Sequence, residues 1–228
     1  IKMDAVQYVR DWLLEERGIS EDNRIIRNLN FIRDTRLLEE MIAFDFDGVI
    51  ADSFSTQLEA AIEIINDMGV NIPKMSIEEL KDYVRNYGHM GLLKLINFPK
   101  IKILKLLGLI KKKQGESVGS VKIFKGIKTV LKSLLTENDI YLLTGNSIDY
   151  IKPFLVRHKI ESFFNEIYSD SLNKGKKSVF DSFYLDHKEN ISGGYYIGDE
   201  VSDIIDSQKI GFKCIASTWG ITSINRLK

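Results

Sequence analysis

Short apolar runs alternate with longer amphipathic stretches along much of the chain. The runs lie at residues 41–44, 140–143, 166–168, 195–197 and 213–216. The amphipathic stretches lie near residues 127–137, 148–159, 177–187 and 201–210, with apolar positions at helical spacing. Strands that alternate with helices are typical of a parallel sheet whose two faces are both covered. The pattern therefore predicts an α/β fold built on a doubly wound parallel sheet.

Two segments break this alternation. Residues 1–40 have the pattern of two helices, and nothing in them suggests chemistry. Residues 54–120 are also helical by pattern and contain no convincing strand. We therefore expect an N-terminal helical extension at 1–40, a core made of 41–53 and 121–228, and a helical insertion at 54–120. The extension is expected to pack on its neighbour or on a partner chain.

The composition favours a folded protein without a global attraction to polyanions. Of the 228 residues, 44% are hydrophobic, which is ample for a buried core. The 32 basic and 32 acidic residues balance, so we expect neither nucleic acid nor a membrane as a partner. The insertion at 54–120 has 10 basic and 7 acidic residues, a net charge of +3. This mild bias toward anions is explained equally well by a solvated helix face.

The cysteine content and the absence of long apolar runs bear on the compartment. A single cysteine, Cys214, excludes an internal disulfide framework and a thiolate zinc site, and it fits a reducing environment. No run approaches the roughly 18 apolar residues that a membrane-spanning helix needs. The first residues also lack the apolar core of a signal peptide. We therefore expect a cytoplasmic protein.

Polar residues follow four of the predicted strands. The carboxyl ends of parallel strands line one crevice of an open sheet, which is where ligands bind. The four clusters are Asp45 with Asp47, then Thr144-Gly145-Asn146, then a turn with Lys174, Lys176 and Lys177, and finally Gly198-Asp199 with Asp203 a helical turn later. We expect these clusters to form one site.

The residue types at this expected site suit phosphoryl transfer. Several carboxylates in one crevice repel each other unless a cation or a proton is present. Oxygen ligands of this kind suit Mg²⁺, which completes its shell with water and substrate phosphate. A lysine, a threonine hydroxyl and backbone N–H groups beside glycines can bind phosphate oxygens. An aspartate can also act as a nucleophile and form an aspartyl-phosphate.

The same clusters resemble the four signatures of the haloacid-dehalogenase superfamily phosphatases. The matching residues, in order, are Asp45-Phe46-Asp47-Gly48-Val49, Leu143-Thr144-Gly145-Asn146, a lysine after Gly175, and Gly198-Asp199 followed by Asp203. The stretch 216–220 also resembles the segment that follows the last core strand in phosphoglycolate-phosphatase-like members of this superfamily. Four motifs in order, each ending a predicted strand, make the resemblance specific over 41–53 and 121–228. It matches the insertion only by position and does not include 1–40.

The resemblance implies roles for the acids. Asp45 would be the nucleophile and a Mg²⁺ ligand. Asp47 would be the general acid and base, with its backbone carbonyl also on the metal. Asp199 would ligate Mg²⁺ directly or through water, with Asp203 supporting it. The insertion would be a small cap that closes over the site and selects the substrate.

The resemblance also implies a set of phosphate-binding residues. Thr144 would hydrogen-bond the transferring phosphoryl group, with Gly145 and Asn146 beside it. A lysine would hold the nucleophile and that group in register. Lys174, Lys176 and Lys177 all lie within reach. Lys176 is preferred, because its distance to Gly198-Asp199 best suits one intervening helix and strand.

The function expected from these residues is a Mg²⁺-dependent phosphatase that acts on a small phosphorylated metabolite through an aspartyl-phosphate. A dehalogenase is disfavoured, because it needs neither Mg²⁺ nor the acid at Asp47. A phosphomutase, which uses the same residues, stays open, as does a non-catalytic phosphate-ligand-binding or regulatory protein. A scaffold role through 1–40 is a further alternative. Neither the substrate nor the oligomeric state follows from the sequence.

Overall fold

The central sheet has five parallel strands in the order β5-β4-β1-β6-β7. The computed structural model describes residues 41–135, 138–170, 174–189, 191 and 193–228, so the predicted extension at 1–40 lies outside the described residues. The strands are β1 (Met41–Phe44), β4 (Asp139–Thr144), β5 (Glu166–Ser169), β6 (Tyr195–Gly198) and β7 (Lys213–Ala216). Each predicted apolar run forms one of these strands, so the predicted α/β fold is confirmed.

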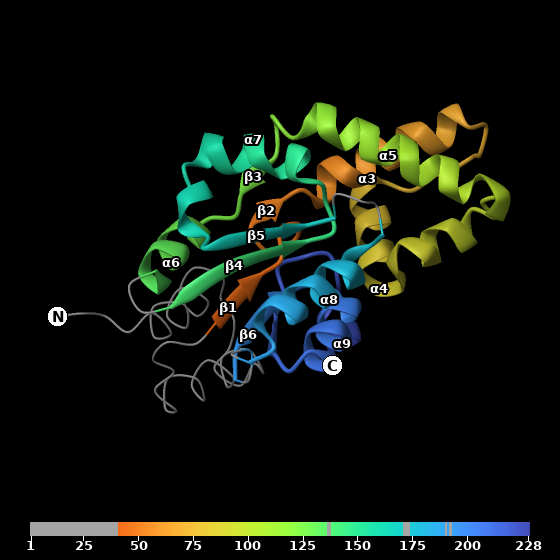
Figure 1. The fold of residues 1–228 in the computed structure, drawn as a ribbon. Coiled ribbons are helices and arrows are strands. Elements are labelled where there is room, and N and C mark those ends of the chain that lie inside the picture. Colours follow the sequence, from red (N-terminus) through yellow and green to blue (C-terminus); the bar gives the residue numbers. More distant parts are fainter. Residues whose placement is uncertain (1–40, 136–137, 171–173, 190, 192) are drawn as a thin grey trace.

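Helices cover both faces of the sheet (Figure 1). The helices α6 (Ile127–Leu134) and α7 (Ile148–His158) lie on one face, and α8 (Lys176–His187) and α9 (Val201–Lys209) lie on the other. Strand β4 contributes apolar side chains to both faces of the sheet, because successive side chains of a strand point to opposite sides. Ile140 and Leu142 belong to the apolar cluster under α6 and α7. Tyr141 and Leu143 belong to the cluster under α8 and α9.

A short two-stranded antiparallel hairpin, whose two strands are separated in sequence by the whole insertion, lies beside the first strand of the sheet. It pairs β2 (Ala51–Asp52) with β3 (Lys122–Ile123) in antiparallel register. The backbone N–H of Phe124 extends the hairpin by donating to the carbonyl of Ile50 at 3.0 Å. The insertion therefore leaves and rejoins the core at neighbouring points. Two-residue strands carry too little periodicity to be recognised from sequence, so this hairpin was not predicted.

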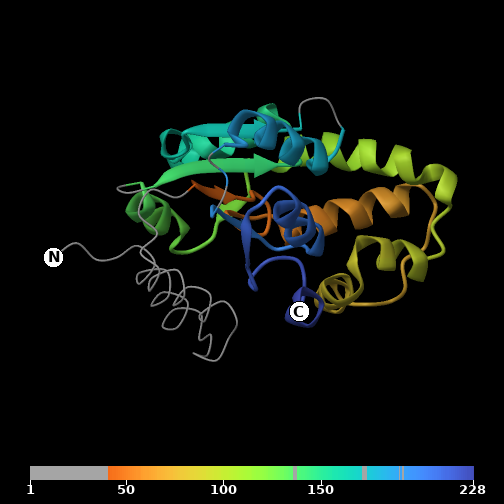
Figure 2. The same cartoon turned by 60° about the horizontal axis from the view of Figure 1, so that its bottom comes forward.

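Between β2 and β3 the chain is helical, as predicted. It forms α3 (Phe54–Asp67), α4 (Ile77–Leu95), the short η1 (Lys100–Lys102) and α5 (Ile103–Ser117). These helices extend to one side of the sheet (Figure 2). Their apolar residues make a cluster of their own, in which Ile221 is the one buried member from outside the insertion among the described residues. The insertion therefore has its own small core.

Local sequence explains how the longest helix, α4, starts and bends. Ser76 and Glu79 form a capping box at its first turn, which satisfies backbone N–H groups that lack helical partners. Gly88, with φ of 74°, kinks the helix near its middle. The remaining short helices are η2 (Glu161–Phe163) and α10 (Ile224–Leu227). Over the described part of the chain, none of the helices combines the length and the apolar character needed to cross a bilayer.

Candidate active site

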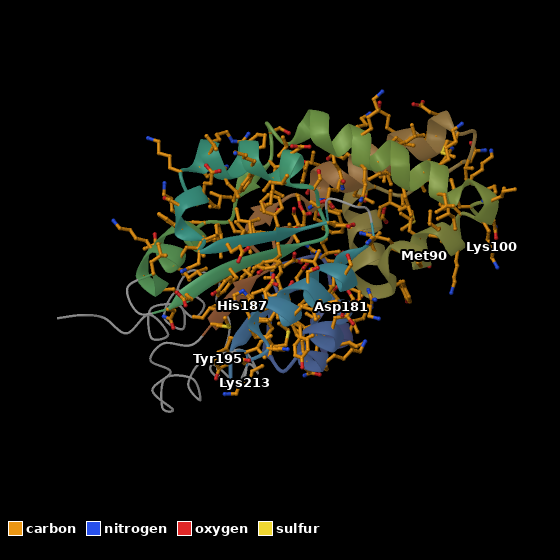
Figure 3. All side chains as sticks on the ribbon, viewed as in Figure 1. Met90, Lys100, Asp181, His187, Tyr195 and Lys213 are labelled. Carbon is orange, nitrogen blue, oxygen red and sulfur yellow. The ribbon has the colours of Figure 1, made fainter. Side chains whose placement is uncertain are left out.

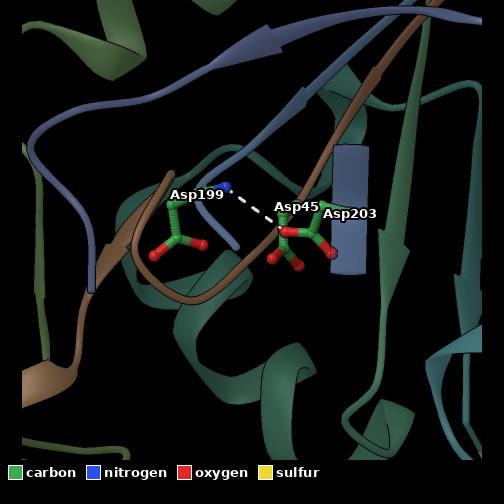
Figure 4. Close-up of side chains that lie close together, drawn as sticks. All are labelled: Asp45, Asp199 and Asp203. Atoms are coloured by element: carbon green, nitrogen blue, oxygen red, sulfur yellow. Dashed lines mark hydrogen bonds between the residues drawn. The ribbon is translucent and has the colours of Figure 1, made fainter. Parts of the chain in front are cut away.

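Three buried acids meet at the carboxyl ends of β1 and β6. Asp45 follows β1, Asp199 follows β6, and Asp203 lies in the first turn of α9. One carboxylate oxygen from each lies within 4.8 Å of the other two (Figure 4). Because β1 and β6 are neighbours in the sheet, their carboxyl ends coincide and deliver Asp45 and Asp199 to the same point. The acids expected at the site from three separate positions in the sequence are thus brought together.

Lys176 extends its ammonium group into this cluster. It is the first residue of α8, and its Nζ lies 2.5 Å from Asp45 Oδ2 and 2.5 Å from Asp203 Oδ1. Burial would lower the pKa of Lys176, but the carboxylates of Asp203 and Asp45 outweigh it and raise that pKa well above its usual value. Lys174 and Lys177, the other two candidates, are exposed. The structure therefore places Lys176, the preferred candidate, at the site.

The acids carry more negative charge than Lys176 can balance. Burial raises the pKa of Asp45 well above its usual value, Lys176 opposes this, and Asp203 and Asp199 add to it. Burial also raises the pKa of Asp199 to about 8, although a hydrogen bond from the Ile221 backbone opposes the shift. A divalent cation would relieve this repulsion, and carboxylate oxygens are the donors that hard cations prefer. The residues present thus fit a divalent metal.

Asp47 is held apart from the three acids by its own hydrogen bonds. Its Oδ1 accepts hydrogen bonds from the Ser53 hydroxyl and from Gln57 Nε2, the latter at 2.8 Å. Its Oδ2 accepts one from Asn146 Nδ2 at 2.5 Å. Burial raises the pKa of Asp47, and the hydrogen bonds from Ser53 and Asn146 partly oppose that shift. The side chain is therefore fixed in place and is easier to protonate than an exposed aspartate.

Sequence reasoning missed Ser53 and Gln57. Ser53 occupies the N-cap position of α3, where a serine usually accepts a hydrogen bond from the helix, yet it makes no such bond. Its hydroxyl donates to Asp47 instead, and Gln57 lies one turn further along the same helix. From sequence alone, a serine directly before a helix is interpreted as an N-cap residue. Only the structure shows that this one serves the site.

The second predicted cluster lies between Asp47 and Lys176. Thr144 is buried at the end of β4, and its Oγ1 accepts a hydrogen bond from the Asn146 backbone N–H at 3.2 Å. A β-carbon added at Gly145 would lie 3.4 Å from the β-carbon of Lys176. The three residues therefore link the acid at position 47 to the lysine, as expected for one continuous site.

Asp170 is a further residue that sequence reasoning missed. It directly follows β5, is buried, and uses both carboxylate oxygens to accept backbone N–H groups, from Lys174 at 2.8 Å and Gly175 at 2.9 Å. Lys111 of α5 also lies 3.8 Å from it. Asp170 thereby holds the turn that begins α8 and presents Lys176. An acid at the carboxyl end of a strand was the same signal that identified Asp45 and Asp199.

We expect the substitution Asp170→Asn to loosen this turn. An amide has one acceptor oxygen, so either the Lys174 or the Gly175 N–H loses its hydrogen bond, and a hydrogen bond to a charged group contributes about 1.5–3 kcal/mol. Urea unfolding should show that loss, and kcat/KM should fall because Lys176 is less well placed. The control Lys111→Met removes the ion pair but keeps both N–H bonds, and should change stability by at most about 1 kcal/mol. Wild-type kcat/KM in Asp170→Asn would show that the turn does not depend on Asp170.

Two glycines make room for the Asp199 carboxylate. A β-carbon at Gly48, which has φ of +71°, would lie 2.0 Å from Asp199 Oδ2, and one at Gly220 would lie 2.3 Å from the same oxygen. The neighbouring Ile221 backbone N–H donates to that oxygen at 2.6 Å. The loop after β7 is therefore built around Asp199, although α9 and β7 lie between that loop and Asp199 in the sequence.

We expect Gly220→Ala to displace Asp199. The added methyl has no room, and overpacking of this kind costs about 1–3 kcal/mol. Turnover should fall along with the free energy of unfolding, both measured on the same preparation. The matched control is Gly108→Ala in α5, where a β-carbon meets nothing within 4 Å and should stabilise the helix by roughly 0.5–1 kcal/mol. Equal effects of the two substitutions would contradict this account of Gly220.

Known proteins similar to this chain carry the names of hydrolases. A family model described as haloacid dehalogenase-like hydrolase matches residues 42–217. The phosphoglycolate phosphatase of Synechococcus elongatus is 24% identical over 184 residues, which cover 79% of this chain and 84% of that protein. A phosphoglycolate phosphatase of Pseudomonas fluorescens is 22% identical over 194 residues, covering 80% and 71% respectively.

The fold also matches solved structures. A haloacid dehalogenase-like family hydrolase from Streptococcus pneumoniae has a TM-score of 0.69 to this chain at 20% sequence identity. The match covers 83% of this chain and 89% of that one. At this identity the likeness concerns the fold alone.

Proposed function

The chain belongs to the haloacid dehalogenase-like hydrolase family, and we propose that it is a Mg²⁺-dependent phosphatase that hydrolyses a small phosphate ester through an aspartyl-phosphate. The observation that carries this proposal is the arrangement of two aspartates with separate partners. Asp45 is paired with Lys176, whereas Asp47 is held by Ser53, Gln57 and Asn146. Two carboxyl groups in different environments can take two different roles.

Asp45 suits the role of nucleophile. Lys176 binds its Oδ2, and the Phe46 backbone N–H donates to its Oδ1 at 2.7 Å, so the carboxylate is held in one orientation. An oxygen of Asp45 attacks phosphorus, the bond from phosphorus to the ester oxygen breaks, and the phosphoryl group is transferred to Asp45. The Lys176 ammonium and the Thr144 hydroxyl are available to phosphate oxygens during this transfer.

Asp47 suits the role of general acid and then of general base. The raised pKa of its buried carboxyl group favours the protonated form that an acid needs. Asp47 donates its proton to the departing ester oxygen. It then accepts a proton from the water that attacks the phosphorus of the aspartyl-phosphate, which releases inorganic phosphate and restores Asp45.

A divalent cation would be held by Asp45 and Asp199, with Asp203 supporting from close by, since oxygens of these three acids converge. When bound, it supplies positive charge that offsets the repulsion between these carboxylates and a substrate phosphate. We assign Mg²⁺ because it binds through few protein carboxylates and leaves room for phosphate oxygens. The earlier expectation placed the backbone carbonyl of Asp47 on the metal as well, and that stays a prediction.

The helical insertion at 54–120 is assigned here as the cap of a core formed by 41–53 and 121–228. It contributes Gln57 to the partners of Asp47, and Lys111 lies beside Asp170. Because it stands next to the site, it is placed to exclude water and to select the ester group. The phosphoglycolate phosphatases among its relatives make a small phosphorylated acid the first substrate class to test.

A turnover screen tests the proposed function. Phosphoglycolate, sugar phosphates, nucleotides and pyrophosphate should be incubated with the protein and Mg²⁺, and release of inorganic phosphate measured. We expect one of the small esters to be hydrolysed, a chelator to suppress the reaction, and added Mg²⁺ to restore it. Calcium should support turnover poorly, because its larger and looser coordination shell misaligns the attack.

Two results would contradict the proposal. Full activity in excess chelator would remove the metal from the mechanism. Isomerisation of a sugar phosphate without release of inorganic phosphate would instead identify a phosphomutase, which uses the same residues.

A further inference from the structure

The outer end of the insertion exposes three large aliphatic side chains. Ile101, Leu104 and Leu107 are 93%, 83% and 51% exposed. They recur every three residues through η1 and the start of α5, so they lie on one side of this segment. Figure 3 shows the neighbouring Lys100 at the end of the insertion that lies away from the sheet. We call these three residues the insertion tip.

The tip is a second apolar face of a helix that already has one. Ile103, Leu106 and Ile110 pack into the core of the insertion, which accounts for the buried side of α5. Surface helices of globular proteins normally place polar residues opposite such a face. Here aliphatic residues take those positions. With more than four fifths of Ile101 and Leu104 exposed, the tip projects into solvent and does not line a groove.

The segment that carries the tip has charges of one sign in its sequence. Residues 83–115 contain no aspartate or glutamate, and they carry one arginine and seven lysines. Lys100, Lys102 and Lys105 alternate with the tip residues, and none of the three forms an ion pair with another described residue. The overall balance of charges in the chain therefore conceals a strongly basic segment. The expectation that no membrane would be a partner rested on that overall balance.

From these observations we propose that the insertion tip docks on the surface of an anionic lipid bilayer. Ile101, Leu104 and Leu107 enter the boundary between headgroups and acyl chains, and the adjacent lysines contact lipid phosphates. A projecting apolar tip fits a deformable bilayer better than a protein partner, which would need a matching groove. A second copy of the chain is disfavoured, because it would bring two acid-free basic segments together.

Co-sedimentation of the full chain with lipid vesicles tests this proposal. The protein should sediment with vesicles of phosphatidylglycerol and phosphatidylcholine in equal parts, but not with pure phosphatidylcholine, and binding should weaken as salt is raised. The double substitution Ile101→Ser/Leu104→Ser should lower the partition coefficient by at least about tenfold. Lys100→Glu/Lys105→Glu should lower it by a similar factor.

Matched controls separate the tip from the rest of the surface. Leu185→Ser removes an aliphatic side chain that is 71% exposed on α8. Lys132→Glu/Lys188→Glu makes the same change of charge at two exposed lysines of the core. Both should bind vesicles within about twofold of wild type, because charges beyond roughly 10 Å are screened. Since all these positions are exposed, unchanged circular dichroism and melting temperature should accompany every variant.

Four results would overturn the proposal. The first is no binding to anionic vesicles, and the second is equal binding to pure phosphatidylcholine. The third is an equal loss of binding in the controls. The fourth is a wild-type oligomer, seen by light scattering, that Ile101→Ser/Leu104→Ser dissociates, since the tip would then be an interface between copies of this chain. None of these results bears on the phosphatase proposal, which depends on residues elsewhere in the structure.

Discussion

Substituting asparagine for Asp45 should reduce phosphatase turnover to background. The change keeps the shape of the side chain and removes the charge and the nucleophilic oxygen, so no aspartyl-phosphate can form. Losses of this kind reach about 10⁴-fold or more when a nucleophile is removed. The measurement is the rate of phosphate release, together with trapping of phosphorylated protein in wild type and its absence in Asp45→Asn.

The fold should survive this substitution. Burial raises the pKa of Asp45 well above its usual value, so the charged form of this carboxyl group is costly in the metal-free fold. A neutral amide should therefore leave the melting temperature in chelator unchanged or higher, and Lys176 keeps its pairing with Asp203. Asp181→Asn, at an exposed position of α8 labelled in Figure 3, is the control and should retain full activity. Wild-type-like hydrolysis by Asp45→Asn would show that Asp45 is not the nucleophile.

Asp47→Asn should separate the two halves of the reaction. With an alkyl phosphate the leaving oxygen is strongly basic, so loss of the acid should block the first half. With nitrophenyl phosphate the first half needs little acid and should proceed, whereas the second half still needs the base. Nitrophenol should therefore appear in a burst approaching one equivalent per site. The steady rate should then fall by about 10²–10⁴-fold, the usual size of general acid–base catalysis.

The hydrogen-bond partners of Asp47 can also accommodate an asparagine. The oxygen of an asparagine at this position can still accept from Ser53 and Gln57. Its amide nitrogen then faces Asn146, whose own amide can rotate to present its oxygen. Unimpaired steady turnover on both substrates would remove Asp47 from the mechanism. Loss of the burst as well, with the fold and metal binding intact, would indicate that its main role is positioning.

The site depends on residues that keep the reacting groups in place. Asp170 anchors the turn before Lys176, and the glycines at 48 and 220 leave space for Asp199. The loop after β7 also supports the first motif directly, because the Ser217 hydroxyl donates to the Gly48 carbonyl at 3.1 Å. Trp219 Nε1 donates to the Val49 carbonyl at 3.3 Å. Trp219 also packs, partly buried, against the main apolar cluster.

The net charge of the whole chain does not reveal the basic segment at the insertion tip. The sequence balances 32 positive and 32 negative charges, and the whole insertion has a net charge of only +3. The residues 83–115 hold no acid at all. The field near a surface depends on charges within about one Debye length, roughly 10 Å at 0.1 M salt. The local distribution therefore decides which partner the tip attracts.

The sequence alone determined the architecture and most of the site's composition. Strand and helix periods are local properties, so β1 and β7 were predicted at their observed bounds, and each end of the other three sheet strands was predicted to within one residue. Parallel strands place their carboxyl ends at one edge, so polar residues after four strands had to converge. Asp45, Asp47, Thr144 and Asp199 could be named as candidates for this reason.

Only the tertiary structure decided which side chains meet. The Lys176 ammonium reaches Asp45 across 131 positions of sequence, and Asn146 reaches Asp47 across 99. Periodicity reports which face of an element is buried, but not where the ends of long side chains from different strands come to lie. That depends on the register of the sheet and on the turns that begin each helix. For the same reason the sequence offered three lysines and the structure brought one of them to the acids. The hydrogen bond from Ser53 to Asp47 likewise became visible only in the structure.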